Sequence, residues 1–163
     1  MLDFLWNNFW GKILMTLVIS MVPVIELRGA IPIAVGNGLN PYIAIPLAII
    51  GNLIPVPFII VFIKRIFAWM RKKSEWLNRL VTKIENRAEK KMGTVQKCAF
   101  WGLFIFVAIP LPGTGAWTGA LIAAMLDMRL KKAFPAIVLG VLTAGIIVAF
   151  VSYGADAVIG SLI

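Results

Sequence analysis

Apolar residues fill four long regions of the chain, at about residues 13–36, 41–63, 98–126 and 133–153. A helix that crosses the roughly 30 Å hydrocarbon core of a bilayer needs about 20 mainly apolar residues. The second and fourth regions fit that description as single helices. The hydropathy pattern therefore predicts an all-α integral membrane protein with two simple transmembrane helices.

The first and third apolar regions are interrupted near their midpoints by proline, glycine and charged residues. Proline removes a backbone donor and disfavours helix at the residue before it. Non-helical backbone at membrane depth persists only where protein or a watery cavity covers it. Both regions are therefore predicted to be broken helices. The interrupting residues are Pro23, Glu26, Arg28, Gly29 and Pro32 in the first region, and Pro110, Pro112, Gly113, Gly115 and Gly119 in the third.

The two halves of the chain repeat each other at an offset of 89 residues. Each half has an apolar arm, a proline-rich break, an arm of small residues, a polar turn and then a full span. Such internal symmetry with broken helices is typical of transporters, in which the substrate site lies at the breaks. Within one membrane domain, 1–163, repeat one covers about residues 10–63 and repeat two about 98–155. The aligned breakers are Pro23 with Pro112, Pro46 with Pro135, and Gly51 with Gly140.

The segment that joins the repeats, residues 64–97, holds 11 basic and three acidic residues. Its apolar residues recur at helical spacing, which predicts a basic amphipathic helix lying on an anionic phospholipid surface. A solvated linker helix is the alternative. Trp69 and Trp76 favour the membrane interface, where aromatic residues are enriched.

The positions of the basic residues discriminate between two topologies. If all four regions were simple spans, the basic segments 64–97 and 129–132 would lie on opposite sides, against the positive-inside rule. If the first and third regions are re-entrant hairpins, both segments lie in the cytoplasm, and 14 of the 16 basic residues are inside. The turn at 37–41 and both termini then lie outside the plasma membrane. This second topology, which we expect, makes the two repeats inverted.

The composition agrees with a membrane protein and excludes several other classes. The chain has 163 residues, of which 61% are hydrophobic and 14% charged, whereas soluble domains are roughly 45–50% apolar and about a quarter charged. The net charge of +9 flanks the apolar spans, so we expect no nucleic-acid partner. The chain has no histidine and one cysteine, Cys98, and its acidic residues are scattered. We therefore expect no metal, no cofactor and no enzymatic activity.

Glu26 and Arg28 are the only charged residues between Lys12 and Lys64. A charge at bilayer depth costs about 2.5–3.5 kcal/mol on insertion scales, so such residues usually serve a function. The alternative is a structural ion pair that pins the hairpin to a neighbour. Residues two apart do not face each other on a helix. A direct pair therefore needs irregular backbone, or each residue must find a different partner.

The breaks suggest how these charges work. The second arm of each hairpin should begin just after a proline, near Glu26 and near Thr114, so that two helix N-termini point at the midplane and favour an anion. Arg28 adds a planar fork suited to phosphate or carboxylate. A desolvated Glu26 is suited to carry a proton. We predict a site that exchanges a proton for an anionic head group, formed by Glu26, Arg28, Gly29, Pro23, Pro32, Pro110, Pro112, Gly113, Thr114, Gly115 and Asn52.

Two motifs resemble a known family. Pro-Val-Ile-Glu-Leu-Arg-Gly-Ala-Ile-Pro at 23–32 and Ile-Pro-Leu-Pro-Gly-Thr-Gly-Ala-Trp-Thr-Gly at 109–119 resemble the small multidrug export proteins, over about residues 10–155. That family is similar to the DedA, or VTT, superfamily, whose members are associated with two inverted re-entrant hairpins and with moving phosphorylated lipid carriers. The resemblance implies that Glu26 is the acidic residue of the first hairpin. The second hairpin departs from DedA proteins, since Gly113, Thr114 and Gly115 stand where those carry arginines.

Three functions follow from the residues and the resemblance together. The first is a proton-coupled transporter or flippase of a phosphorylated lipid carrier or other anionic amphiphile. The second is an exporter of small molecules, in which a lone glutamate exchanges protons for cationic drugs, although Arg28 argues against a cation. The third is a non-transporting membrane scaffold. Because two hairpins and two spans hardly seal a pathway, we expect a homodimer among membrane lipids.

Overall fold

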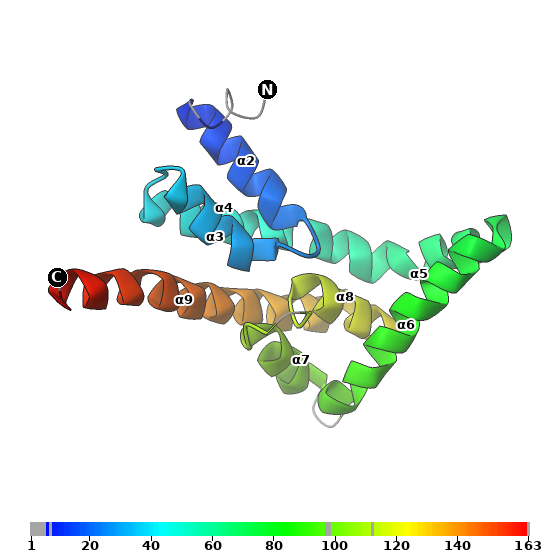
Figure 1. Cartoon of the computed structure of the whole chain (residues 1–163). Helices are drawn as coiled ribbons and strands as arrows, with labels where there is room; N and C mark the ends of the chain where they lie inside the picture. The colour runs from blue at the N-terminus through cyan, green and yellow to red at the C-terminus, as the bar shows by residue number, and fades with distance from the viewer. Residues whose placement is uncertain (1–5, 7, 97–98, 112, 163) are drawn as a thin grey trace.

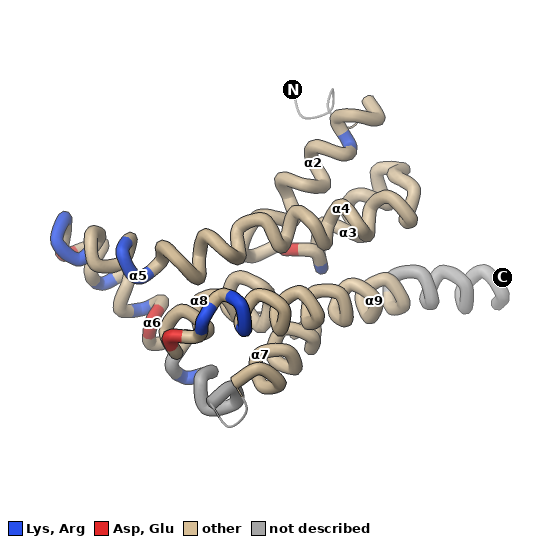
Figure 2. Tube along the Cα trace, turned by 180° about the vertical axis from the view of Figure 1, so that it is seen from behind, with Lys and Arg blue, Asp and Glu red and all other residues tan. Residues whose placement is uncertain are grey.

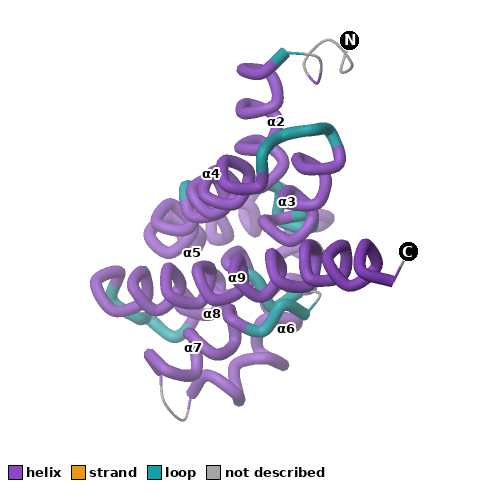
Figure 3. The backbone as a smooth tube through the Cα atoms, turned by 90° about the vertical axis from the view of Figure 1, so that its left-hand side faces the viewer, coloured by secondary structure: helices purple, strands orange, loops and turns teal. Residues whose placement is uncertain are grey.

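The computed structural model describes residues 6, 8–96, 99–111 and 113–162, and of residues 89, 91–96 and 152–162 the backbone only (Figure 1). The described residues form helices joined by short turns, and none of them is in a strand (Figure 3). A helix satisfies its own backbone hydrogen bonds, which suits so apolar a chain. The helices are α2 (Phe9–Met21), α3 (Glu26–Gly36), α4 (Pro41–Leu53), α5 (Pro55–Lys73), α6 (Glu75–Gln96), α7 (Ala99–Ala108), α8 (Ala116–Met125) and α9 (Leu130–Leu162).

Two helical stretches are long and apolar enough to cross a membrane: Pro41–Lys73, which comprises α4 and α5, and Leu130–Val151 of α9. They run in opposite directions along the molecule (Figure 1). At one end of the pair, Lys64 Nζ of α5 lies 2.6 Å from Asp127 Oδ1, just before α9. Further along, Gly145 of α9 packs against the side chain of Ile49 on α4. This all-helical arrangement is compatible with the predicted membrane protein.

The predicted span at 41–63 is interrupted after α4. α4 ends at Leu53 and α5 begins at Pro55, which has no backbone N–H. Ile54 between them keeps helical dihedral angles, with φ −54° and ψ −49°. The chain therefore continues in nearly the same direction, as Figure 1 shows.

The prediction of one helix over 64–97 is wrong in its bounds. α5 carries the chain as far as Lys73, and the new helix α6 begins at Glu75. Ser74 between them is extended, with φ −163°, and its hydroxyl accepts a hydrogen bond from the Trp76 N–H at 3.3 Å. A serine that caps a helix in this way competes with helix continuation. The basic segment is therefore the end of α5 followed by α6.

The apolar side of α6 faces the protein. Val81 and Ala88 are fully buried, and α6 packs against α5, α7 and α8. Trp69, Trp76 and Leu80 remain exposed. In Figure 2 the charged residues gather where α5 meets α6 and at the start of α9, whereas most of the bundle is free of charge. Binding of this segment to an anionic lipid surface stays a prediction. In that case the exposed side chains of Trp69, Trp76 and Leu80 would contact the lipid.

Two pairs of short helices, α2 with α3 and α7 with α8, correspond to the predicted broken helices. α7 and α8 have 10 residues each, or about 15 Å, roughly half of a hydrocarbon core. A Cβ on Gly38 would lie 3.3 Å from Lys12 Nζ, so the end of α3 returns to the start of α2. The end of α8 is tied to α5 by the ion pair of Asp127 with Lys64.

Pro32 does not break the first hairpin, contrary to the prediction. It lies inside α3, which continues to Gly36, and its side chain is exposed. The ring costs one backbone hydrogen bond, which the remaining helix tolerates. The interruption is confined to residues 22–25, between Met21 and Glu26.

The turns that precede the long helices are built twice with the same hydrogen bonds. Gly38 and Asp127, which are 89 residues apart, both have positive φ, of 77° and 52°. Each ends a short helix with a pair of backbone hydrogen bonds that is common at helix C-termini. The equivalent bonds are Gly38 N to Val35 O and Leu39 N to Ala34 O in the first half, and Asp127 N to Ala124 O and Met128 N to Ala123 O in the second.

Glycine allows the long helix of each half to contact the first arm of that half. A Cβ on Gly51 would lie 2.8 Å from Leu17 O of α2. A Cβ on Gly140 would lie 2.7 Å from Val107 Cβ and 3.0 Å from Phe104 O of α7. Gly51 and Gly140 are 89 residues apart, so the offset found in the sequence also relates equivalent helix contacts. It also relates the helix starts, since α4 begins at Pro41 and α9 at Leu130.

Candidate functional site

Glu26 begins α3 and is 5% exposed. Its φ is 51°, in the left-handed region that a residue with a Cβ seldom adopts, which costs of order 1–3 kcal/mol. Its N–H donates to Val22 O at 2.9 Å, which closes the turn out of α2. Pro23, in the same turn, cannot donate a hydrogen bond. The turn points the carboxylate away from α2 and toward α8.

The carboxylate of Glu26 lies at the N-terminus of α8. Trp117 N donates to Glu26 Oε1 at 3.4 Å. A Cβ on Gly115 would overlap both carboxylate oxygens, so glycine is required for this approach. A helix N-terminus carries partial positive charge and unpaired N–H groups, which favour a carboxylate. The helix end that was predicted to bind an anion is therefore occupied by the carboxylate of Glu26.

Arg28, two residues on, contacts the other side of the second break. Its guanidinium donates to Leu111 O, to Ile109 O at 3.3 Å and to Thr114 Oγ1 at 3.3 Å. Ile109 directly follows α7, so these carbonyls belong to the negative end of that helix. Each charge of the first hairpin therefore complements one helix end of the second hairpin.

No ion pair joins Glu26 to Arg28 in the described part of the chain. Of the two arrangements that their spacing allowed, the structure has the one with a different partner for each. Both charged side chains thus connect the two hairpins, so each of them has a structural role in this site. The two roles are compatible, because a contact made by a buried carboxylate is lost when the group is protonated or displaced.

The remaining polar groups of the breaks also pair. Thr114 Oγ1 donates toward the carbonyls of Ile109 and Leu111, both at 2.8 Å, and accepts from Leu111 N at 3.2 Å. Trp117 Nε1 donates to Met21 O, the last residue of α2, at 3.0 Å. Irregular backbone needs such partners wherever water does not reach it. Thr114 was among the predicted site residues, whereas Trp117 was not.

Asn52 is buried in α4 beside Glu26. Within the described residues, neither its amide nitrogen nor its amide oxygen has a hydrogen-bond partner. Among these residues the Asn52 amide therefore makes no hydrogen bond to either hairpin. Asn52 lines a narrow gap that has no room for a water molecule. The other residues around the gap are Glu26, Leu27, Arg28, Val107, Gly115, Ala116, Val141 and Ala144.

Three pairs of the residues around this gap are 89 positions apart: Glu26 with Gly115, Leu27 with Ala116, and Asn52 with Val141. In two of these pairs the first half supplies a polar side chain and the second half a small or apolar residue. The repeated scaffold thus forms the gap, and the difference between the halves gives it its polar groups.

The other predicted site residues are spread around the breaks. Gly29 packs against the side chain of Ile25, and Pro110 is half-buried in the second break. Pro23 and Gly113 line a groove beside the gap. Pro32 lies in α3, outside both breaks, and Pro112 lies outside the described residues. In the described part of the chain, no three His, Cys, Asp or Glu side chains lie close enough to hold a metal ion.

Comparison with known proteins gives one match. The family model described as "Putative small multi-drug export protein" matches residues 26–147, which include both breaks and the gap. This confirms the family to which the two sequence motifs pointed. No curated protein and no solved structure matches the chain.

Proposed function

The chain belongs to the small multi-drug export protein family, and on that premise we propose that it is a transporter in which a proton on Glu26 is exchanged for an anionic group. The anion would bind between Arg28 and the N-terminus of α8. The single observation that carries this proposal is that the Glu26 carboxylate lies against Gly115 and accepts from Trp117 N.

Protonation of Glu26 would remove the only carboxylate that lies at this helix end among the described side chains. The free N–H groups of α8 and the guanidinium of Arg28 would then attract another anion. Release of the proton would restore the carboxylate and expel that anion by repulsion and competition. The buried amide of Asn52 would supply one more hydrogen-bonding group once the gap opens. The proton and the anion are thus coupled at Glu26, because the anion binds at the N-terminus of α8 only while Glu26 is protonated.

We further propose that the two helix pairs are re-entrant hairpins related as inverted repeats. Three observations support this: the turns repeat at an offset of 89, the long helices are antiparallel, and Lys12 lies beside Gly38. The ion pair of Lys64 with Asp127 favours one side for the segments 64–97 and 129–132. The positive-inside rule makes that side cytoplasmic.

The proposed substrate is an anionic amphiphile, with a phosphorylated lipid carrier as one example. Arg28 supports a negative group, and the resemblance to DedA proteins supports a lipid. A second candidate is an exporter of cationic drugs, and the family description supports drug export without giving the charge of the drug. That function would need Glu26 but would gain nothing from Arg28. The third alternative is a membrane scaffold that transports nothing, so neither Glu26 nor Arg28 would be needed for transport.

The test is transport by the purified protein in liposomes that contain a pH-sensitive dye. Dodecyl phosphate serves as the anionic probe and tetraphenylphosphonium as the cationic probe. If the protein transports anions, wild type and the surface control Glu75→Gln should move protons when dodecyl phosphate is present and not with tetraphenylphosphonium. Glu26→Gln and Arg28→Ala should not move protons with dodecyl phosphate. Proton movement with tetraphenylphosphonium in Arg28→Ala would instead support drug export. Unchanged transport in both Glu26→Gln and Arg28→Ala would contradict the proposal.

We also propose a homodimer, because the described part of one chain has only two full spans to cover its short helices. Native mass spectrometry in detergent tests this, with a dimer as the expected species. A monomer at all protein concentrations would contradict it.

A further inference from the structure

An apolar groove of about 690 Å³ lies beside the Glu26 gap, between α5, α6 and α8. Its volume falls in the range of roughly 300–1,000 Å³ that is usual for small-molecule sites. Pro23 of the first break and Gly113 of the second are among the residues that line it. Its apolar walls are formed by Ile59, Ile63, Phe67, Ile84, Ala88 and Leu121.

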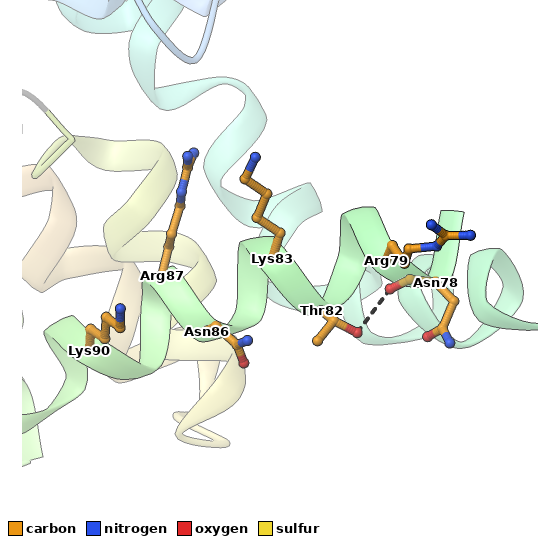
Figure 4. Close-up of a pocket in the computed structure, with 7 residues that line it drawn as sticks. All are labelled: Asn78, Arg79, Thr82, Lys83, Asn86, Arg87 and Lys90. Atoms are coloured by element: carbon orange, nitrogen blue, oxygen red, sulfur yellow. Dashed lines mark hydrogen bonds between the residues drawn. The ribbon is translucent and has the colours of Figure 1, made fainter. Parts of the chain in front are cut away.

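Two cations of α6, Arg87 and Lys90, also line this groove. In the described part of the chain neither has a carboxylate partner, whereas Arg71 and Arg79 each face a glutamate. Figure 4, a close-up of a neighbouring pocket that Arg87 and Lys90 also line, shows the Arg87 side chain extending toward the space between α5 and α8. A groove with apolar walls and two unpaired cations complements a molecule with an apolar chain and a negative head group.

The groove reaches the candidate site through Trp117. The side chain of Trp117 forms part of its wall, and the N–H of the same residue donates to Glu26. A ligand in the groove would thus contact the residue that holds the Glu26 carboxylate in place. Arg87 and Lys90 lie on the charged α6, and Pro23 and Gly113 lie at the breaks, so the groove connects the charged end of the molecule with its centre.

From this juxtaposition we infer that the groove binds one anionic lipid of the surrounding membrane, with its apolar chain between α5 and α8 and its phosphate on Arg87 and Lys90. The role of the bound lipid as a substrate rests on the proposed function. The binding of the lipid to the groove does not. It adds a site for the substrate before the exchange at Glu26, and it adds Arg87 and Lys90 as specificity-determining residues.

The experiment is equilibrium binding to the full chain in a neutral detergent, with short-chain phosphatidic acid as the probe and phosphatidylcholine of the same chain length as its uncharged match. Wild type should bind the phosphatidic acid saturably and more tightly. Arg87→Gln with Lys90→Gln should weaken that binding roughly 10- to 30-fold, since each cation near a lipid surface contributes about 1 kcal/mol. The matched control Arg79→Gln with Lys83→Gln, on the same helix but outside the groove, should bind as wild type.

Leu121→Trp fills the groove without changing charge and should abolish binding of both lipids. Lipid binding in detergent and proton movement in liposomes are measured separately, so a failure of the exchange mechanism is distinguishable from a failure of the groove. Equal weakening by the groove pair and the control pair would show binding to the whole basic surface of α6 and would overturn the inference. Equal affinity for the two lipids in wild type would also overturn it.

Discussion

The carboxylate of Glu26 lies against the α-carbon of Gly115, and these two residues occupy equivalent positions in the two halves of the chain. Equivalent residues of two repeats meet only near the axis that relates the repeats. The gap beside them is lined by two further equivalent pairs, which agrees with such an axis. The Glu26 side chain fills the space between the two positions, so the partner position has to be glycine.

The first prediction concerns Gly115. Gly115→Ala places a methyl group on the Glu26 carboxylate and should destabilise the fold by about 1–3 kcal/mol, as overpacking usually does. Unfolding of the purified protein by denaturing detergent measures this change. Gly36→Ala is the matched control, because a Cβ there meets nothing within 4 Å.

The double variant Glu26→Ala with Gly115→Ala separates the clash from other effects of alanine. Removal of the carboxylate should restore much of the stability that Gly115→Ala loses, since the two residues are in direct contact. If the effects of the two substitutions simply add, the contact of Glu26 with Gly115 is not the cause.

The second prediction concerns Arg28, which pairs with the carbonyls at the end of α7. Arg28→Ala should destabilise the protein by about 1.5–3 kcal/mol, the range for hydrogen bonds to charged groups. Arg28→Lys should lose less, because it keeps the charge but not the fork that reaches several acceptors. Arg79→Ala is an exposed arginine control. An Arg28→Ala variant as stable as that control would show that the pairing is not part of the folded protein.

The third prediction uses the unpaired amide of Asn52. Asn52→Leu removes a buried donor and acceptor and should stabilise the fold by about 1–3 kcal/mol, the usual penalty of an unsatisfied buried group. Transport should fall in the same variant if the amide serves the substrate. Asn86→Leu on the exposed side of α6 controls for added hydrophobicity. A loss of stability in Asn52→Leu would assign the amide a packing role.

The fourth prediction concerns the glycines that bring each long helix to its own hairpin. Gly51→Ala and Gly140→Ala should each destabilise the protein, because a methyl group would press on the backbone of α2 or α7. Protection from proteolysis in detergent measures both. Two losses of similar size would fit the repeated architecture, and a loss at one position alone would contradict it.

The sequence predicted the elements of this fold well, because breakers and apolar length are local signals. The offset of 89 found from Pro46, Gly51 and their counterparts also relates the turns at Gly38 and Asp127. The sequence did not predict that α3 continues through Pro32 or that a helix ends before Ser74. At both positions neighbouring residues decide whether a helix continues. Whether a helix tolerates one proline or ends at one serine depends on packing that the pattern does not contain.

The site was predicted in part. Glu26, Arg28 and Thr114 were identified because charge and hydroxyl groups are rare in apolar segments. Their partners were not, since those are the N–H of Trp117 and the carbonyls of Ile109, which every residue type carries. Backbone partners at a break appear only when the two hairpins are placed together in space.

We propose that both proline-rich segments turn back within the membrane, so that the two hairpins approach Glu26 from opposite sides. Single cysteines at Asn40, Lys72 and Lys131, in a background with Cys98 replaced by serine, test it by labelling with a membrane-impermeant reagent in intact and opened cells. We expect the cysteines at Lys72 and Lys131 to react from the same side and the cysteine at Asn40 to react from the other. Labelling of Lys72 and Lys131 from opposite sides would contradict it.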